Sequence, residues 1–278
     1  MLKVGFIGLG DMGGAIAHRI IGAGFPTALW ARREATLQQF PPGSFTRCAD
    51  PAEVGQHSDV VGVCVFGDAD VRQIILEGDG LLQGMKPGGT ILIHSTVSAE
   101  VCSEVAIEAA RRGCAVLDAP VSGGLDGALR GKLAIMLGGE AAALARIRPV
   151  LASYGAVIRL MGPVGSGQKM KVLNNILSYA NGRLAIIAIE TGQRLGLDPE
   201  AVLEVLRSGG AGSASIDSIA DRLLPDPPFQ RHAVTMVVKD TALFTGIRAE
   251  AGLAPTLLEQ LAQERSQQIV PDMNARGR

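Results

Sequence analysis

The sequence predicts an α/β domain built on a doubly wound parallel sheet, followed by an all-α C-terminal domain that a long helix joins to it. Short apolar runs alternate with helix-like segments through about the first 160 residues. The strand signals stop after the segment of residues 162–167, and a helical pattern without a Gly or Pro breaker covers residues 169–180. Because 278 residues are enough for two domains, we expect a first domain at residues 1–163 and a helical domain at residues 164–278.

The expected strands are short, apolar and separated by turns such as Lys86-Pro87-Gly88-Gly89. They are residues 3–8, 27–30, 60–66, 90–94, 115–119, 133–138 and 157–160. Helical segments lie between them, which favours a parallel sheet with crossover helices. In the second domain the pattern predicts helices over residues 168–195 and 198–208, with Gly182 and Gly192 as weak points of the longer helix.

Composition excludes several classes of protein. Hydrophobic residues make up 47% and charged residues 19% of the chain, which is typical of a globular protein. The net charge of −1 provides no basic field for nucleic acid or an acidic membrane, and no apolar run reaches membrane-spanning length. The four cysteines form no C-x-x-C pair and no Cys/His metal spacing, so we expect reduced thiols and no metal. Since the first strand starts at once, we also expect no signal peptide and a cytoplasmic protein.

The first strand runs directly into a glycine-rich turn. Gly8-Leu9-Gly10-Asp11-Met12-Gly13 is a G-x-G-x-x-G motif, and residues 15–21 after it have a helical pattern. A strand, a glycine turn and a helix form the dinucleotide site of Rossmann-type domains, where N–H groups at the helix start face the pyrophosphate. Gly8 permits the turn, Gly10 lets the backbone approach phosphate, and Gly13 allows close packing of helix on strand. The motif alone also fits an ordinary strand–turn–helix unit, but its context here favours a dinucleotide.

The end of the second strand carries the residues that select between NAD and NADP. An NAD site usually has an acidic residue here, about 20 residues past the glycines, for the ribose 2′-hydroxyl. This chain has Ala31, Arg32 and Arg33, and its first acidic residue is Glu34. Because arginine pairs bidentately with a 2′-phosphate, the sequence favours NADP over NAD. The alternative is that both arginines are merely solvated at a helix start.

Two polar residues stand out on the long helix. Lys171 and Asn175 are four residues apart and share a face, so they can address one ligand. A lysine among apolar neighbours loses solvation, which lowers its pKa and suits it to proton exchange near neutral pH. Alternatively, Lys171 extends to water and Asn175 is a surface residue.

Three further segments are ambiguous when each is taken singly. Ser122-Gly123-Gly124 follows a strand and can form an anion-binding turn for a carboxylate, or a plain glycine turn. His94-Ser95-Thr96 ends a strand at the edge where α/β proteins bind ligands, and His94 by itself is more typical of a packed or capping histidine. Lys239-Asp240 has the pattern of a helical charge pair.

Taken together and in this order, these segments resemble the β-hydroxyacid dehydrogenase family, which includes 3-hydroxyisobutyrate dehydrogenases, tartronate semialdehyde reductases and glyoxylate/succinic semialdehyde reductases. The matching pieces are residues 5–13, Ser95-Thr96, residues 118–124, residues 165–175 and Lys239-Asp240. They span most of the chain, and their joint order is more specific than any single motif. The chain departs from the family where His94 replaces its usual aspartate and where Phe66-Gly67 replaces Leu-Pro.

The resemblance implies a role for each matching position. Lys171 corresponds to the catalytic lysine, the general acid/base for the substrate oxygen. Ser122, Gly123 and Gly124 correspond to the loop that binds the substrate carboxylate, and Asn175 to the amide that positions the substrate. Motif and resemblance together give these cofactor contacts: Gly8, Leu9, Gly10, Asp11, Met12, Gly13, Ala31, Arg32, Arg33, Val65, Phe66, Thr96 and Lys239.

We therefore expect an oxidoreductase that transfers a hydride between NADP(H) and a small 3-hydroxy acid or the corresponding semialdehyde or keto acid. We expect a small carboxylate as substrate, no nucleic acid or membrane partner, and a homodimer or homotetramer formed through the helical domain. An imine reductase of the same architecture and a non-catalytic cofactor-binding module are the alternatives, and Lys171 counts against both. The 6-phosphogluconate branch shares the N-terminal motif but has a much longer helical domain.

Overall fold

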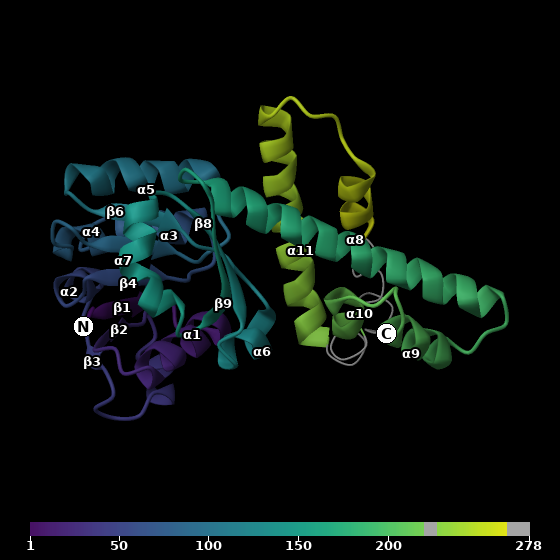
Figure 1. Cartoon of the computed structure of the whole chain (residues 1–278), viewed down its shortest axis with the longest axis horizontal. Helices are drawn as coiled ribbons and strands as arrows, with labels where there is room; N and C mark the ends of the chain where they lie inside the picture. Colours follow the sequence, from purple (N-terminus) through teal and green to yellow (C-terminus); the bar gives the residue numbers. More distant parts are fainter. Residues whose placement is uncertain (220–226, 266–278) are drawn as a thin grey trace. The chain divides into compact units, whose positions relative to one another are not determined.

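The computed structural model of the chain describes residues 1–219 and 227–265 and consists of two compact units, Met1–Lys171 and Val172–Arg278 (Figure 1). The division between the units falls within helix α8, Ser166–Arg194, whose first residues belong to the first unit. The domain ranges 1–163 and 164–278 stay a prediction.

The first unit is built on one nine-stranded sheet of order β3-β2-β1-β4-β5-β6-β8-β7, with β9 paired to β8. The strands are β1 Val4–Ile7, β2 Thr27–Trp30, β3 Thr46–Arg47, β4 Val60–Val63, β5 Thr90–Ile93, β6 Ala115–Asp118, β7 Val121–Ser122, β8 Leu133–Gly138 and β9 Gly155–Gly162. All pairs from β3 to β6 are parallel. Every residue of β1, β4 and β5 is buried, as expected for central strands of a sheet that is covered on both faces.

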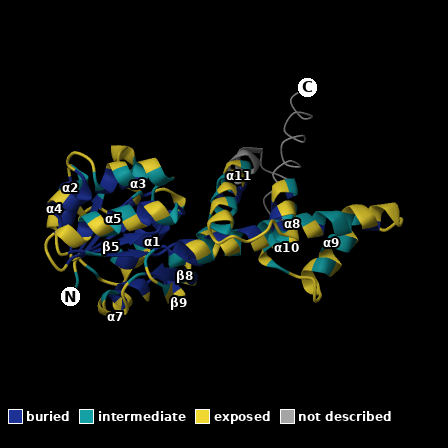
Figure 2. Ribbon diagram, turned by 90° about the horizontal axis from the view of Figure 1, so that it is seen from above, coloured by how far each residue is buried: buried dark blue, intermediate teal, exposed yellow. Residues whose placement is uncertain are grey.

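Helices cover both faces of this sheet (Figure 2), and strands β1, β2, β4, β5, β6 and β8 are almost entirely buried, whereas β3 and most of β9 are exposed. Successive strand residues point to opposite faces, so Phe6 belongs to one apolar cluster and Ile7 to the other. The Phe6 cluster includes residues of α1 Asp11–Gly22, α6 Gly124–Leu129 and α7 Ala141–Leu151. The Ile7 cluster includes residues of α2 Pro51–Gln56, α3 Asp68–Ile75, α4 Leu81–Gly84 and α5 Ala99–Arg111. This arrangement confirms the doubly wound fold; a 3-10 helix, η1 Glu34–Gln39, follows β2.

The sheet departs from the expected all-parallel order at β8. Strand β8 runs antiparallel to β6 and β7 and parallel to β9. Only Ala119 and Pro120 separate β6 from β7, so β7 continues in the direction of β6, and the chain reverses through α6 before β8 begins. The short strands β3 and β7 were not expected, because two residues carry no hydrophobic periodicity.

The second unit is helical in all its described residues. It consists of most of α8, then α9 Pro199–Ser208, α10 Ala214–Ser218, α11 Pro227–Glu250 and a helical segment over residues 257–265. Buried Val172 and Ile176 of α8 pack with Ala262 of that last segment. Gly182 and Gly192 do not interrupt α8. A Cβ at Gly192 would lie 2.9 Å from a methyl group of Val202, so this glycine allows α9 to pack closely on α8.

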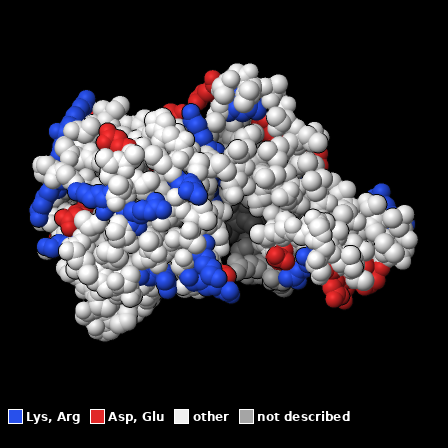
Figure 3. All heavy atoms as spheres, viewed as in Figure 1, with Lys and Arg blue, Asp and Glu red and all other residues white. Residues whose placement is uncertain are grey.

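The charged side chains on the surface are mixed in sign, in agreement with the net charge of −1. Lys and Arg form several separate groups on the face of the first unit seen in Figure 3, with acidic side chains among them. Among residues 1–219 and 227–265, no helix combines the length and the apolar character that crossing a membrane requires.

Candidate active site

In the first unit, the residues predicted to bind the cofactor lie at one edge of the sheet, whereas Lys239 belongs to the second unit. Parallel strands β1, β2, β4, β5 and β6 all end there, and the glycine turn, Arg32, Val65 and Thr96 each follow one of these strands. Strand β1 lies between β2 and β4, so the chain leaves β1 toward one side of the sheet and later returns on the other side. Open α/β sheets bind ligands at such a switch point, outside the carboxyl ends of the strands.

The glycine turn has the close contacts and the open space that a pyrophosphate site needs. Gly8 has φ +90, and a Cβ there would lie 2.2 Å from the carbonyl oxygen of Cys64. A Cβ at Gly13 would lie 1.9 Å from the carbonyl oxygen of Gly8, so α1 can approach β1 only with glycine at this position. At Gly10, the N-cap of α1, an added Cβ meets nothing within 4 Å. The first N–H groups of α1 have no acceptor within the helix, and they start beside this open space.

The other residues of this turn differ in burial: two face the core and one faces solvent. Leu9 is buried and Met12 is half-buried against the core, so they support the turn from inside. Asp11 is exposed in the first turn of α1, where a carboxylate is favoured by the helix dipole.

At the end of β2, Arg32 is held by helix α3. Ala31 is half-buried, whereas Arg32 and Arg33 are exposed. The Nη2 atom of Arg32 lies 3.1 Å from Oδ1 of Asp70 and 3.2 Å from Oε1 of Gln73.

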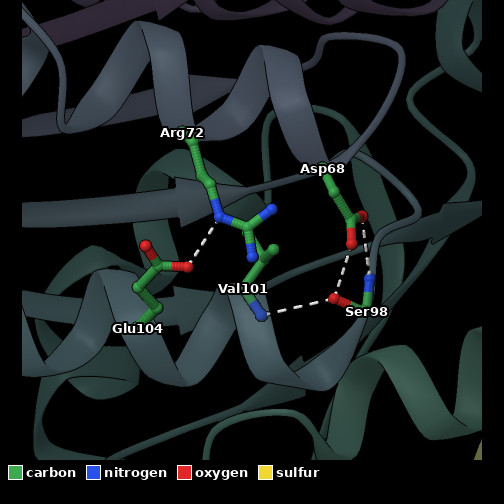
Figure 4. Close-up of polar contacts among 5 residues, drawn as sticks. All are labelled: Asp68, Arg72, Ser98, Val101 and Glu104. Carbon is green, nitrogen blue, oxygen red and sulfur yellow. Dashed lines mark hydrogen bonds and ion pairs between the residues drawn. The ribbon is translucent and has the colours of Figure 1, made fainter.

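The loops that follow β4 and β5 are joined by hydrogen bonds. The N–H of Val65 donates to the hydroxyl oxygen of Ser95 at 2.8 Å. Asp68, the first residue of α3, accepts from the N–H of Ser98 at 3.1 Å and from its hydroxyl at 2.6 Å (Figure 4). The same hydroxyl oxygen accepts from the N–H of Val101 and so caps α5. These contacts fix the loop that carries Phe66, which is 54% exposed, beside the loop that carries buried Thr96.

An ion pair continues this link between the two helices. Nε of Arg72 on α3 lies 2.7 Å from Oε2 of Glu104 on α5, as Figure 4 shows. Both side chains are more than a third exposed, so this pair adds little stability compared with the Asp68–Ser98 contact.

The first turn of α8 is anchored to the same edge by two buried residues. Fully buried Asp118, the last residue of β6, accepts from the N–H of Gly165 at 2.7 Å and from that of Gln168 at 2.8 Å. Burial raises the pKa of the Asp118 carboxyl, and the backbone N–H donors oppose that effect. The buried side chain of Gln168 donates to the carbonyl oxygen of Ser95 at 2.8 Å and accepts from the N–H of Val97 at 3.2 Å.

Lys171 follows Gln168 by three residues, which is nearly one helical turn. Its side chain is half-buried. The contacts of Asp118 and Gln168 therefore set the place of Lys171 relative to the loops after β4 and β5. The lowered pKa that we expect for Lys171 stays a prediction.

The proposed carboxylate loop lies between β7 and β8. Ser122 is in β7, opposite Ala134 of β8, and is half-buried. Gly123 and Gly124 follow with φ +130 and +63, and both are exposed. Two successive residues with positive φ require glycine, and such a turn leaves its backbone N–H groups accessible to an anion.

In the second unit, Asn175 is held by a buried carboxylate. Its Nδ2 donates to Oδ2 of Asp240 at 2.7 Å, and the hydroxyl of Tyr179 donates to the same oxygen at 2.7 Å. Asp240 is fully buried, and its Oδ1 has no hydrogen-bond partner among the described residues. Burial, together with the charge of Asp240, raises the pKa of Tyr179. Asp240 is thus an anchor for Asn175, and Lys239, which precedes it, is half-buried.

His94 is a packed histidine, as expected. Its Nδ1 lies 2.7 Å from the carbonyl oxygen of Ala119, so Nδ1 carries the hydrogen and Nε2 accepts from the hydroxyl of Tyr154 at 3.3 Å. Burial lowers the pKa of His94 to about 4, and its ring stacks on Phe6. Among the described residues, no group of three or more His, Cys, Asp or Glu side chains is placed to hold a metal ion.

Three important residues of this arrangement were not singled out from the sequence: Gln168, Asp68 and the carboxylate of Asp118. Each is a polar residue next to a recognised motif, at the start of a helix or the end of a buried strand. A polar side chain in such a place must find a partner, and that requirement was the available signal.

The sheet order, the glycine turn and the open space at Gly10 define a dinucleotide-binding protein of the Rossmann type. The family model described as the NAD binding domain of 6-phosphogluconate dehydrogenase matches residues 3–162. The model described as NAD-binding of NADP-dependent 3-hydroxyisobutyrate dehydrogenase matches residues 165–276.

Individual proteins are similar over most of the chain. The Arabidopsis thaliana protein described as "Probable 3-hydroxyisobutyrate dehydrogenase-like 2, mitochondrial" is 34% identical, over 91% of this chain and 83% of its own length. The structure of Mycobacterium tuberculosis 3-hydroxyisobutyrate dehydrogenase with L-serine has a TM-score of 0.80 and 26% identity, covering 98% of this chain and 95% of that one. Psf3, solved in complex with NADP+ and 2-OPP, has a TM-score of 0.81 and 26% identity, covering 95% and 93%. The chain belongs to the β-hydroxyacid dehydrogenase family and is an NAD-binding oxidoreductase that acts on CH–OH groups.

Proposed function

We propose that the protein catalyses reversible hydride transfer between NADP(H) and a small 3-hydroxy acid or the corresponding semialdehyde or keto acid. The observation that carries this proposal is the series of hydrogen bonds from Val65 through Ser95 and Gln168 to the first turn of α8. It links the cofactor edge to the helix turn that precedes Lys171. A general acid/base must keep a fixed position relative to the cofactor, because proton and hydride are exchanged with the same substrate carbon–oxygen group.

The residues at the sheet edge fit a dinucleotide. The open space at Gly10 and the start of α1 suit the pyrophosphate, and Arg32 and Arg33 suit a 2′-phosphate. Val65, exposed Phe66, Thr96 and, from the second unit, Lys239 are the proposed contacts of the nicotinamide half. When bound, the cofactor supplies the hydride, and the protein supplies position and electrostatics. The description of Psf3 with NADP+ supports the choice of NADP.

Five residues bind and convert the substrate in this proposal. Ser122 and the backbone N–H groups of Gly123 and Gly124 bind its carboxylate, and the amide of Asn175 orients it. Lys171 donates a proton to the carbonyl oxygen during reduction and removes that proton during oxidation. Such acid/base catalysis typically accelerates a reaction by about 10²- to 10⁴-fold. The description of a relative with L-serine, itself a 3-hydroxy acid, supports this class of substrate.

The test combines activity with binding. The purified chain is assayed with a panel of 3-hydroxy acids and semialdehydes, with NADP(H) and NAD(H) in parallel. The variant Lys171→Ala is compared with Lys169→Ala, which removes a lysine on another face of α8. We expect Lys171→Ala to lose about 10²-fold or more in kcat while binding NADP+ as the unmodified protein does, and Lys169→Ala to change little. Retention of most activity by Lys171→Ala would exclude the assigned role, and a clear preference for NAD would overturn the role of the two arginines. A cyclic imine is assayed beside this panel, and reduction of the imine alone would assign the protein to the imine reductase class instead.

We also propose the wider organisation that the sequence predicts. Residues 1–163 form the cofactor domain, and residues 164–278 form the substrate and oligomerisation domain of a homodimer or homotetramer in the cytoplasm. Light scattering of the purified chain and imaging of the tagged protein in cells test these two points.

A further inference from the structure

Arg32, the residue proposed to bind the 2′-phosphate, already has an acidic partner. Its Nη2 atom lies 3.1 Å from Oδ1 of Asp70 and 3.2 Å from Oε1 of Gln73. Asp70 and Gln73 are three residues apart on α3 and therefore share one helix face. One nitrogen of the guanidinium is thus shared between two acceptors that the protein itself provides.

The neighbouring charges do not compete in the same way. Glu34 forms an ion pair with Arg47 at 2.7 Å, and Asp68 is engaged by Ser98. For Arg33, we find no acidic partner among residues 1–219 and 227–265, and its side chain is exposed. Asp70 is therefore the carboxylate that contacts Arg32 at the end of β2.

A bound 2′-phosphate needs the same guanidinium. A phosphate monoester carries about two negative charges near neutral pH and prefers two parallel N–H donors from arginine. A bidentate contact uses Nη2 together with a second guanidinium nitrogen, so Arg32 has to release Asp70 or Gln73 from Nη2. In either case the Asp70 carboxylate lies near a second anion. NAD has a neutral 2′-hydroxyl at this position, so the Asp70 contact does not oppose NAD.

We propose that Asp70 is a specificity-determining residue of the cofactor site: its carboxylate holds Arg32 and competes with the 2′-phosphate of NADP, which reduces the preference for NADP over NAD. This inference rests on the proposed function, because it assumes that the dinucleotide binds at this edge. The contact between Arg32 and Asp70 is partly exposed, with side chains 64% and 30% accessible. Removing the carboxylate should therefore tighten NADP+ binding by only about twofold to fivefold.

The chain contains a natural reporter for the test. Its single tryptophan, Trp30, is two residues before Arg32, and its indole N–H donates to the carbonyl oxygen of Ala49 at 2.9 Å. The fluorescence of Trp30 is titrated with NADP+ and with NAD+ in the full chain, without substrate, so that the readout is binding rather than activity. The variants are Asp70→Asn, Arg32→Ala and the two together. Glu108→Gln is the matched control, because it removes one negative charge from another exposed arginine pair, Glu108–Arg111 at 2.6 Å on α5.

We expect Asp70→Asn to bind NADP+ about twofold to fivefold tighter and NAD+ with unchanged affinity. Glu108→Gln should match the unmodified protein. In the Arg32→Ala background the Asp70→Asn change should tighten NADP+ binding less, because no guanidinium is left to release and only the repulsion between carboxylate and phosphate is relieved. Unchanged or weaker NADP+ binding by Asp70→Asn, or the same tightening without Arg32, would overturn the inference. If the unmodified chain binds neither dinucleotide, the proposed function itself is overturned, which distinguishes the two failures.

Discussion

Replacing Asp118 by asparagine should destabilise the first unit, because the Asp118 carboxylate anchors the start of α8. One carboxylate oxygen accepts from the N–H of Gly165 and the other accepts from the N–H of Gln168. Asparagine has only one acceptor oxygen, so its NH₂ group would face one of these two N–H donors. Asp118 is fully buried, so that N–H donor would lose the carboxylate oxygen that now accepts its hydrogen bond.

The expected loss can be worked out from this geometry. A hydrogen bond to a charged group contributes about 1.5–3 kcal/mol, and a buried donor without a partner costs about 1–3 kcal/mol. Burial raises the pKa of Asp118, which means that the charge itself is disfavoured there, and its removal recovers part of the loss. We therefore expect Asp118→Asn to lower the free energy of unfolding by about 2–4 kcal/mol.

Urea unfolding followed by the fluorescence of Trp30 measures this quantity, since the only tryptophan lies in the first unit. Asp126→Asn is the control: Asp126 pairs with Arg130 at 2.8 Å, and both side chains are at least 60% exposed. Its loss should stay below about 1 kcal/mol. A free energy of unfolding for Asp118→Asn within about 0.5 kcal/mol of the unmodified protein would refute the argument that this carboxylate holds α8.

Three further predictions concern pH, the second unit and the glycine turn. Burial lowers the pKa of His94 from 6.5 to about 4. As pH drops from 6.5 to 4 the unfolded chain binds a proton that the folded chain does not, so the free energy of unfolding falls by about 3 kcal/mol. Urea unfolding of His94→Asn across this pH range should show a smaller fall, and an equal fall would contradict the lowered pKa of His94. Asp240→Asn should lower kcat/KM by about tenfold to a hundredfold, because the Asp240 oxygen that accepts from both Asn175 and Tyr179 loses its charge and holds Asn175 less firmly. Steady-state kinetics that match the unmodified protein would contradict the role of Asp240 in positioning Asn175. Gly13→Ala should cost about 3 kcal/mol in urea unfolding, because its Cβ would lie 1.9 Å from a backbone oxygen. Gly10→Ala has open space, so it should fold normally and weaken only dinucleotide binding, and equal losses of stability in the two variants would be the contrary result.

The hydrophobic pattern predicted the limits of a strand well where its apolar residues all lie within the sheet. The expected limits 27–30 and 133–138 are those of β2 and β8. The expected strand at residues 60–66 ends instead at Val63. Val65 and Phe66 continue the apolar run, but they leave the sheet at its carboxyl edge, and Phe66 is exposed. An apolar residue in a loop beyond the sheet looks the same in sequence as one that packs in the core.

The polar contacts that assemble the site had no local pattern to predict them. Asp118 meets Gln168 across 50 residues, Gln168 meets Ser95 across 73, and Asn175 meets Asp240 across 65. Periodicity reports which face of one element is buried, but it does not report which buried donor meets which acceptor. The resemblance to a family identified Lys171 and Asn175, and only the fold identified the residues that hold them.

These buried residues give the long helix two separate anchors. The first turn of α8 is fixed within the first unit by Asp118 and Gln168. Within the second unit, the same helix is fixed by Asp240 through Asn175 and Tyr179. Lys171 lies between the two anchors on one continuous helix, so its distance along the axis from Asn175 is about 6 Å and does not depend on how the units are arranged. The proposed proton-transferring lysine and the proposed substrate-orienting amide therefore keep a constant spacing, because a single helix carries both.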